Sequence, residues 1–129
     1  ENFREAKLMT FMFADYQIIS DETIQTYVSN CVNNEMVEIA VIHIFSLLPN
    51  ALPNAKKWLS DSRRYVKMAG YLTIARLAMK QSFGTENDLQ DIFPSYERDV
   101  ISTDFFVYHS VQKAFQELAF RRQVLMFYT

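Results

Sequence analysis

Glycine and proline are scarce in this sequence. Only 2 glycines and 3 prolines occur among the 129 residues, whereas folds built from short strands use both residues at their many turns. This scarcity excludes a turn-rich all-β fold and predicts a chain that is mostly helical. No stretch alternates apolar and polar residues with the period of two that marks a half-buried strand. The predicted fold class is therefore all-α.

Cysteine and long hydrophobic runs are nearly absent as well. The single cysteine, Cys31, cannot form an internal disulfide, so a reducing compartment, the cytoplasm, is the expected location. No apolar run approaches the roughly 18 residues needed to cross a bilayer, and no signal sequence opens the chain. We expect no membrane partner. His43 and His109 fall on different helices and are expected to be packed or half-exposed side chains, so neither a metal nor another cofactor is predicted.

Hydrophobic residues are plentiful by contrast. They make up 50% of the chain and charged residues 22%, a composition that excludes intrinsic disorder. A mass of 15.2 kDa corresponds to one domain with a core of its own. We expect residues 1–129 to form a single helical-repeat domain. Because residue 1 is Glu and not Met, the sequence is compatible with a piece of a longer chain.

Apolar spacing, capping residues and breakers divide the chain into helices. Pro49 and Pro53 are expected to bracket a short loop, and Pro94 to kink or split the helix that contains it. Caps are expected at Ser20 or Asp21 and among Ser102, Thr103 and Asp104. The expected helices cover residues 2–13, 21–31, 35–48, 55–59 and 63–81, a segment from Thr85 past Ile92, and a last helix that ends near Arg122.

The strongest pattern is an internal repeat. Three of the expected helices align at offsets of 29 and then 41 residues, and they share two large positions, a valine, a small residue and a leucine. The shared positions fall on one helix face. In order along the helix they are Met36, Tyr65 and Phe106; Val37, Val66 and Val107; Ala40, Ala69 and Ser110; Phe45, Ile74 and Phe115; and Leu48, Leu77 and Leu118.

A shorter and more polar helix precedes each of the three aligned helices. Helix pairs that recur every 30 to 45 residues or so are typical of HEAT-like α-solenoids, in which stacked pairs bury a continuous core. We therefore expect a HEAT-like α-solenoid of antiparallel helix pairs with about three repeats. The alternative is an irregular helical bundle whose apolar faces are alike by chance.

Positive charge is concentrated in the middle of the chain. Seven basic residues and one acid between Asn50 and Ser82 give +6, and six basic and 14 acidic residues elsewhere give −8, for a net charge of −2. Such asymmetry can steer an anionic partner to one face. The alternative is a solvated helix surface.

Three segments carry a family resemblance. Residues 58–69 have the sequence WLSDSRRYVKMA, residues 106–115 have FVYHSVQKAF, and residues 34–40 have NEMVEIA. They resemble, in that order, the central repeat, the following repeat and the Trp-Asp-x-Val-Asp region of the AlkD-type DNA alkylation repair proteins. The resemblance spans most of the chain, from about Asp21 to Arg122.

The resemblance implies a solenoid whose basic concave face holds duplex DNA, and an N-glycosylase that releases cationic alkylated purines without a metal. The key acid of that family falls on Glu38, which would stabilise the developing oxocarbenium sugar. This sequence departs from the family at three places. The positions of the two family tryptophans fall on Asn34 and near Lys113, and the position of the basic pair holds Lys67-Met68. For Glu38 the alternative is a surface carboxylate paired with a nearby lysine.

Two functions are consistent with these features. The first is a DNA-binding protein of the alkylation-repair type, in which five cations contact phosphates of double-stranded DNA without sequence preference. The second is a non-catalytic scaffold that docks an acidic protein partner through the same basic repeat. The five expected phosphate contacts are Lys56, Lys57, Arg63, Arg64 and Lys67.

Overall fold

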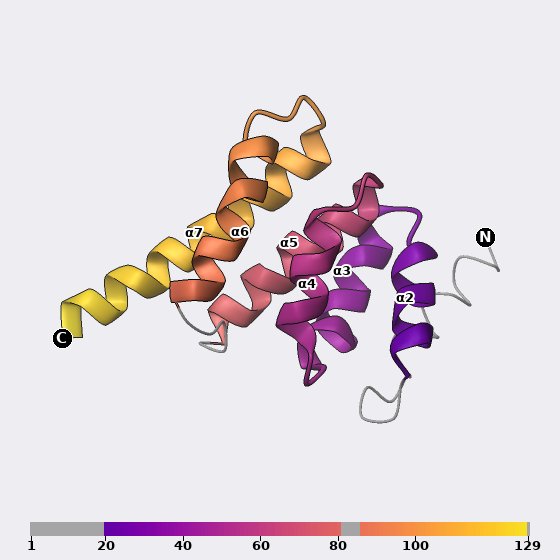
Figure 1. Ribbon diagram of the computed structural model, residues 1–129, viewed down its shortest axis with the longest axis horizontal. Helices are drawn as coiled ribbons and strands as arrows, with labels where there is room; N and C mark the ends of the chain where they lie inside the picture. Colours follow the sequence, from indigo (N-terminus) through magenta and orange to yellow (C-terminus); the bar gives the residue numbers. More distant parts are fainter. Residues whose placement is uncertain (1–19, 81–85, 129) are drawn as a thin grey trace.

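The computed structural model describes residues 20–80 and 86–128, and this part of the chain contains helices and no strand (Figure 1). The predicted all-α class is confirmed. The predicted helix over residues 2–13 and the predicted cap Thr85 lie outside the described residues. The elements are α2 (Asp21–Ser29), α3 (Asn34–His43), the 3-10 helix η1 (Phe45–Leu47), α4 (Ala51–Leu59), α5 (Arg64–Met79), α6 (Glu86–Asp99) and α7 (Phe105–Tyr128).

Side-chain caps begin three of the helices. The Ser20 hydroxyl accepts a hydrogen bond of 3.2 Å from an amide in the first turn of α2. The Asp104 carboxylate accepts one of 3.0 Å from the amide of Phe106 in α7. Both caps were expected from the sequence. Asn33 accepts a bond of 2.8 Å at the start of α3, so it ends one loop and begins the next helix.

Three predicted boundaries are wrong. The helix predicted to reach Leu48 ends at His43, because Ile44 leaves the helical region at φ −132° and ψ −66° before η1 begins. Pro53 is not in a loop: it is the third residue of α4, where the first turn has no intrahelical acceptor for an amide that proline lacks. The last helix does not end near Arg122 but continues to Tyr128. Of the two effects expected of Pro94, a kink or a split, the split does not occur, because Pro94 lies inside α6.

The central element is α5, which contacts α3 on one side and α7 on the other and also packs against α4 (Figure 1). The three helices aligned by the repeat, α3, α5 and α7, therefore lie next to one another in chain order. The stacked HEAT-like solenoid remains a prediction. None of the helices within residues 20–80 and 86–128 combines the length and the apolar character that a membrane span requires.

The core is built from the positions that the repeat shares. Every valine, every small residue and every leucine of the alignment is buried, and the large positions are buried or half-buried. The largest buried side chain is that of Trp58, which packs edge-on against Phe45 with ring centroids 4.8 Å apart and donates a hydrogen bond of 3.0 Å to Gln25. This single residue joins α2, η1 and α4.

Gly70 sets the distance between α4 and α5. A Cβ atom at this position would lie 2.9 Å from the carbonyl oxygen of Ala55 and 2.9 Å from Cδ2 of Leu59. The first of these neighbours is backbone and cannot move aside without shifting α4. Glycine inside a helix costs about 1 kcal/mol relative to alanine, and the close approach of the two helices offsets that cost.

We predict that Gly70→Ala destabilises the protein by about 1–3 kcal/mol, because the added methyl group overpacks the contact between α4 and α5. Urea unfolding monitored by circular dichroism measures the change. In an unobstructed helix the same substitution would stabilise the fold by about 1 kcal/mol. A gain in stability would therefore contradict the close contact.

Candidate binding cleft between α3, α5 and α7

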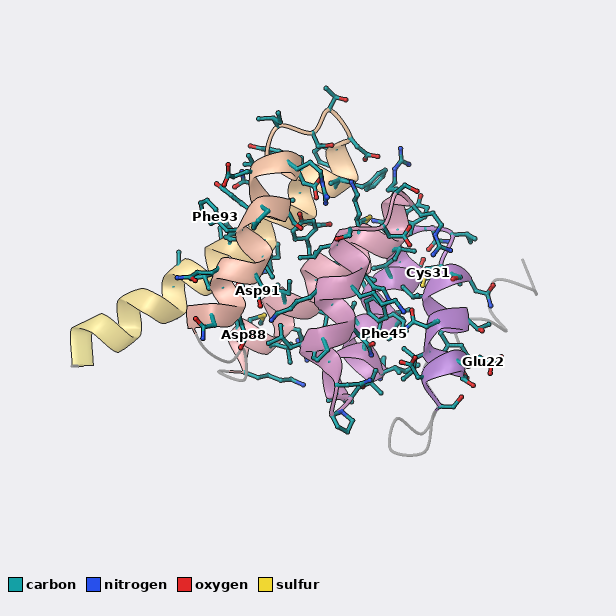
Figure 2. The ribbon with its side chains drawn as sticks, in the orientation of Figure 1. Glu22, Cys31, Phe45, Asp88, Asp91 and Phe93 are labelled. Atoms are coloured by element: carbon teal, nitrogen blue, oxygen red, sulfur yellow. The ribbon has the colours of Figure 1, made fainter. Side chains whose placement is uncertain are left out.

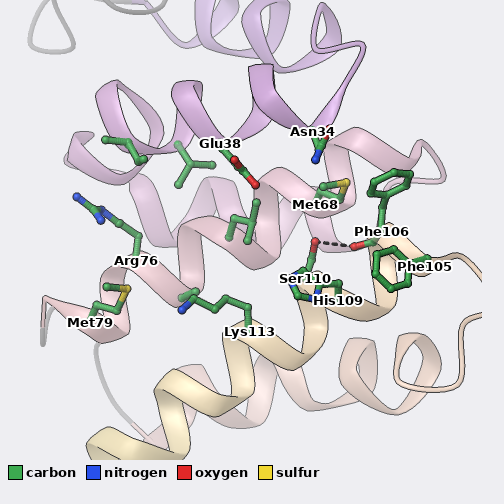
Figure 3. Close-up of a pocket in the computed structure, with 14 residues that line it drawn as sticks. Asn34, Glu38, Met68, Arg76, Met79, Phe105, Phe106, His109, Ser110 and Lys113 are labelled. Carbon is green, nitrogen blue, oxygen red and sulfur yellow. Dashed lines mark hydrogen bonds between the residues drawn. The ribbon is translucent and has the colours of Figure 1, made fainter.

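A cleft of about 460 Å³ opens where α3, α5 and α7 meet (Figure 3). Its walls are largely apolar, and its polar and charged groups come from all three helices. The lining residues are Asn34, Glu38, Val41, Ile42, Met68, Leu72, Ala75, Arg76, Met79, Phe105, Phe106, His109, Ser110 and Lys113.

Glu38, the predicted catalytic acid, lines this cleft from α3 (Figure 3). Its neighbours on the buried side of α3, Val37 and Val41, are in the core, whereas Glu38 itself is exposed. No described residue forms an ion pair or a hydrogen bond with its carboxylate, so the alternative of a surface acid paired with a lysine has no support among the described residues. The carboxylate is thus open to a ligand.

Two cations, Arg76 from α5 and Lys113 from α7, line the cleft as well. Lys113 forms an ion pair of 3.2 Å with Glu117 one turn further along its own helix. For Arg76, no carboxylate partner is found among the described residues. The cleft therefore presents one negative and two positive side chains on separate helices. Arg76 could not be singled out from the sequence, because an arginine on a helix has no local pattern that marks it as part of a cleft.

Aromatic side chains form one end of the cleft (Figure 3). Phe105 is 70% exposed, and its ring stacks on His109 with centroids 5.8 Å apart and an interplanar angle of 14°. Phe106 is half-buried, and the Arg64 guanidinium lies over its ring at 5.3 Å. These rings form an aromatic wall of the cleft. The family resemblance did not predict it, because the tryptophan positions of that family fall elsewhere, on Asn34 and near Lys113.

The five predicted phosphate contacts lie outside this cleft. Lys56 on α4 bonds to two carboxylates of α6, at 2.6 Å from Asp88 and 3.0 Å from Asp91, and both acids lie on the side of α6 toward α4 (Figure 2). The hydrogen bond from Lys56 to Asp88 raises the pKa of the Lys56 ammonium. Lys57 is exposed and forms no ion pair with a described residue.

Two of the cations pair near the start of α5. Arg63 binds Asp61 at 2.9 Å, and this hydrogen bond lowers the pKa of the Asp61 carboxyl and raises that of the guanidinium. Arg64, the first residue of α5, binds Asp104, the cap of α7, at 2.6 Å. Both arginines are exposed, so these pairs contribute little to stability, but they balance the local charge.

Lys67 belongs to a buried network. Its ammonium lies 3.2 Å from Asp99, whose carboxylate is 4% exposed and also accepts hydrogen bonds from Tyr71 at 2.5 Å and Arg98 at 2.7 Å. Burial alone would raise the pKa of Asp99, but the hydrogen bonds from Arg98, Tyr71 and Lys67 outweigh it and hold that pKa below its usual value. Burial, followed by the bond to Asp99, raises the pKa of Tyr71 far above its usual value.

The structure thus separates the predicted site residues into two groups. Glu38 lines the cleft, whereas four of the five cations are paired with carboxylates, three of them from α6 or the loop before α7 and one from the nearby Asp61. Within residues 20–80 and 86–128, no three histidine, cysteine or acidic side chains come together as a metal site would require. Comparison with known proteins found no significant match to a family model, a curated protein or a solved structure.

We predict that Asp99→Asn destabilises the protein by about 1–3 kcal/mol, because the hydrogen bonds that Lys67, Tyr71 and Arg98 donate to the buried carboxylate would be weakened or lost. Urea unfolding at pH 7 measures the loss. Asp91→Asn is the matched control on the same helix, and because Asp91 is exposed it should cost less than about 1 kcal/mol.

The same network predicts a pH dependence. Since the pKa of Asp99 is lower in the folded protein, its stabilising contribution is present above about pH 4 and is lost as the pH falls through the folded value. The free energy of unfolding should therefore fall below pH 4 in the wild type and fall less in Asp99→Asn. An equal fall in the free energy of unfolding below about pH 4 in the two proteins would contradict the role assigned to Asp99.

Proposed function

We propose that this protein binds duplex DNA through the cleft between α3, α5 and α7, as a HEAT-like helical-repeat protein of the alkylation-repair type. The observation that carries the proposal is the position of Glu38, an unpaired carboxylate that lines the same cleft as Arg76 and Lys113. The packing of α3, α5 and α7 in chain order, with α4 packed against α5, supports the helical-repeat arrangement.

The cleft has the groups that excision of a cationic base needs. An alkylated purine carries a positive charge and is already a good leaving group, so the main requirement is a fixed negative charge near the sugar that becomes an oxocarbenium ion. Glu38 supplies that charge, and its carboxylate can also orient the attacking water. The apolar wall and the exposed ring of Phe105 offer surfaces against which an extruded base can pack.

The cleft cations replace most of the phosphate contacts expected from the sequence. Contact of Lys56, Arg63, Arg64 or Lys67 with DNA would compete with an ion pair to a carboxylate. Competition of this kind reduces the net gain from neutralising a phosphate. Arg76 has no such competitor among the described residues. The pair of Lys113 with Glu117 is about as exposed as the pairs of Arg63 and Arg64, so the competition is strongest for the less exposed Lys56 and Lys67.

We predict a shallow salt dependence of DNA binding. Each phosphate contact contributes about −0.9 to the slope of log affinity against log salt, so two cleft cations give about −1.8, whereas the five cations of the central cluster would give about −4.5. Titration of a labelled duplex at several salt concentrations measures the slope. A flat response would contradict DNA binding. A slope of about −4.5 would indicate that the five central cations, and not the two cleft cations, contact the phosphates.

We predict that Glu38→Gln lowers the rate of release of methylated purines from alkylated duplex DNA by about 100-fold or more, because it removes the charge opposite the developing cation. Release of free base, separated by chromatography, is the measurement. Glu97→Gln is the matched control, since Glu97 is an exposed acid on α6 outside the cleft. Release by Glu38→Gln at the wild-type rate would remove Glu38 from the chemistry.

A protein-binding scaffold is the second candidate. The exposure of Ile42, Met79 and Phe105 around the cleft favours it, because an apolar rim beside Arg76 and Lys113 suits an amphipathic acidic peptide. Binding of a labelled acidic amphipathic peptide, compared with a duplex at the same salt concentration, separates the two functions. Tighter binding of the peptide would favour the scaffold.

A further inference from the structure

Arg76 differs from the other arginines whose side chains the structure describes. Arg63, Arg64 and Arg98 each form an ion pair with an aspartate. Arg76 forms none with a described residue, although it is partly buried and lines the cleft. In addition, its Nε atom is shielded from solvent and donates to no acceptor in the described part of the chain.

An arginine whose Nε atom is buried without an acceptor is unfavourable unless a ligand supplies that acceptor. A buried donor without an acceptor is costly, and more so when the group is charged. The position of Arg76 in the last turn of α5 explains why a positive charge is tolerated, because the carbonyl end of a helix favours cations. It does not explain a shielded Nε atom without an acceptor. An anionic ligand in the cleft would supply that acceptor.

The surroundings of Arg76 define the chemistry of this ligand. A guanidinium binds the oxygens of a phosphate or carboxylate through two parallel hydrogen bonds. Lys113 adds a second positive charge from α7, and Glu38 places a negative charge on α3, across the cleft (Figure 3). A ligand that carries negative charge at one end and a neutral or cationic group at the other is complementary to this arrangement. A nucleotide with an alkylated base meets both conditions.

We propose that Arg76 binds a backbone phosphate beside the nucleotide that enters the cleft, and so positions that nucleotide with its base toward Glu38. This inference rests on the proposed function, because it takes the ligand to be a DNA strand. Arg76 is a positioning residue: it holds the phosphate, whereas Glu38 faces the sugar and base. One specific phosphate of the strand should therefore depend on Arg76.

A double-mutant cycle between protein and DNA tests this inference. The probes are duplexes in which single phosphates are replaced, one at a time, by uncharged methylphosphonates, and the proteins are the wild type and Arg76→Gln. With unmodified DNA we expect Arg76→Gln to lose affinity about tenfold and to reduce the magnitude of the salt slope by about 1. With the methylphosphonate at the contacted position, the two proteins should bind equally.

Lys80→Gln is the matched control. Lys80 carries the same charge at the C-cap of α5 but does not line the cleft. It should lose the same small amount of affinity at every linkage. Arg76→Lys keeps the charge and the stem of the side chain but loses the paired donors, so it should retain the salt slope and lose affinity. It takes the place of Arg76→Gln in the cycle if that variant does not fold.

The outcomes separate the two proposals. Coupling between Arg76 and a single linkage supports the inference. If the wild type binds duplex DNA but Arg76→Gln loses affinity equally at every linkage, as Lys80→Gln does, the role of Arg76 is overturned and the proposed function stands. If the wild type does not bind DNA at any salt concentration, the proposed function and the inference both fail.

Discussion

The burial of α5 on nearly all sides is the constraint on which the rest of the structure depends. Buried residues occur at four consecutive positions, Met68 to Tyr71, and four residues of a helix span most of its circumference. Such a helix is stable only if neighbours cover every face: α3 and α7 cover two sides, and α4 covers the side of Gly70. The cleft forms where α3 and α7 flank α5, so its position follows from the same requirement.

The electrostatic arrangement follows from this packing as well. Because α5 is the central helix, cations at its edges meet acids from α6 and from the loop before α7, and Asp99 gathers Lys67, Tyr71 and Arg98 into one buried network. These pairs hold α5 to α6 and balance the charge of the central segment. What remains for a ligand is the cleft side of α5, where Arg76 faces the open space shared with Glu38.

Local features of the sequence predicted the helices, several caps and the shared core positions, because each depends on residues within a few turns. Ion pairing could not be predicted in this way. The partners of Lys56, Arg64 and Lys67 lie 32 to 40 residues further along the chain, so a count of charge in one segment suggested a basic surface that folding largely neutralises. Glu38 was found through a family resemblance, whereas Arg76 gave no local signal. The break at Ile44 and the place of Pro53 depend on how α3 and α4 pack.

Our central proposal is that duplex DNA binds in the cleft and not at the central cation cluster of Lys56, Lys57, Arg63, Arg64 and Lys67. The most direct measurement is an NMR titration of isotope-labelled protein with a short duplex that contains a single unpaired or alkylated base. The account predicts that the largest shifts fall on residues of α3, α5 and α7 around Glu38, Arg76 and Lys113. Shifts confined to α4 and the start of α5, around Lys56, Lys57 and Arg63, would contradict it.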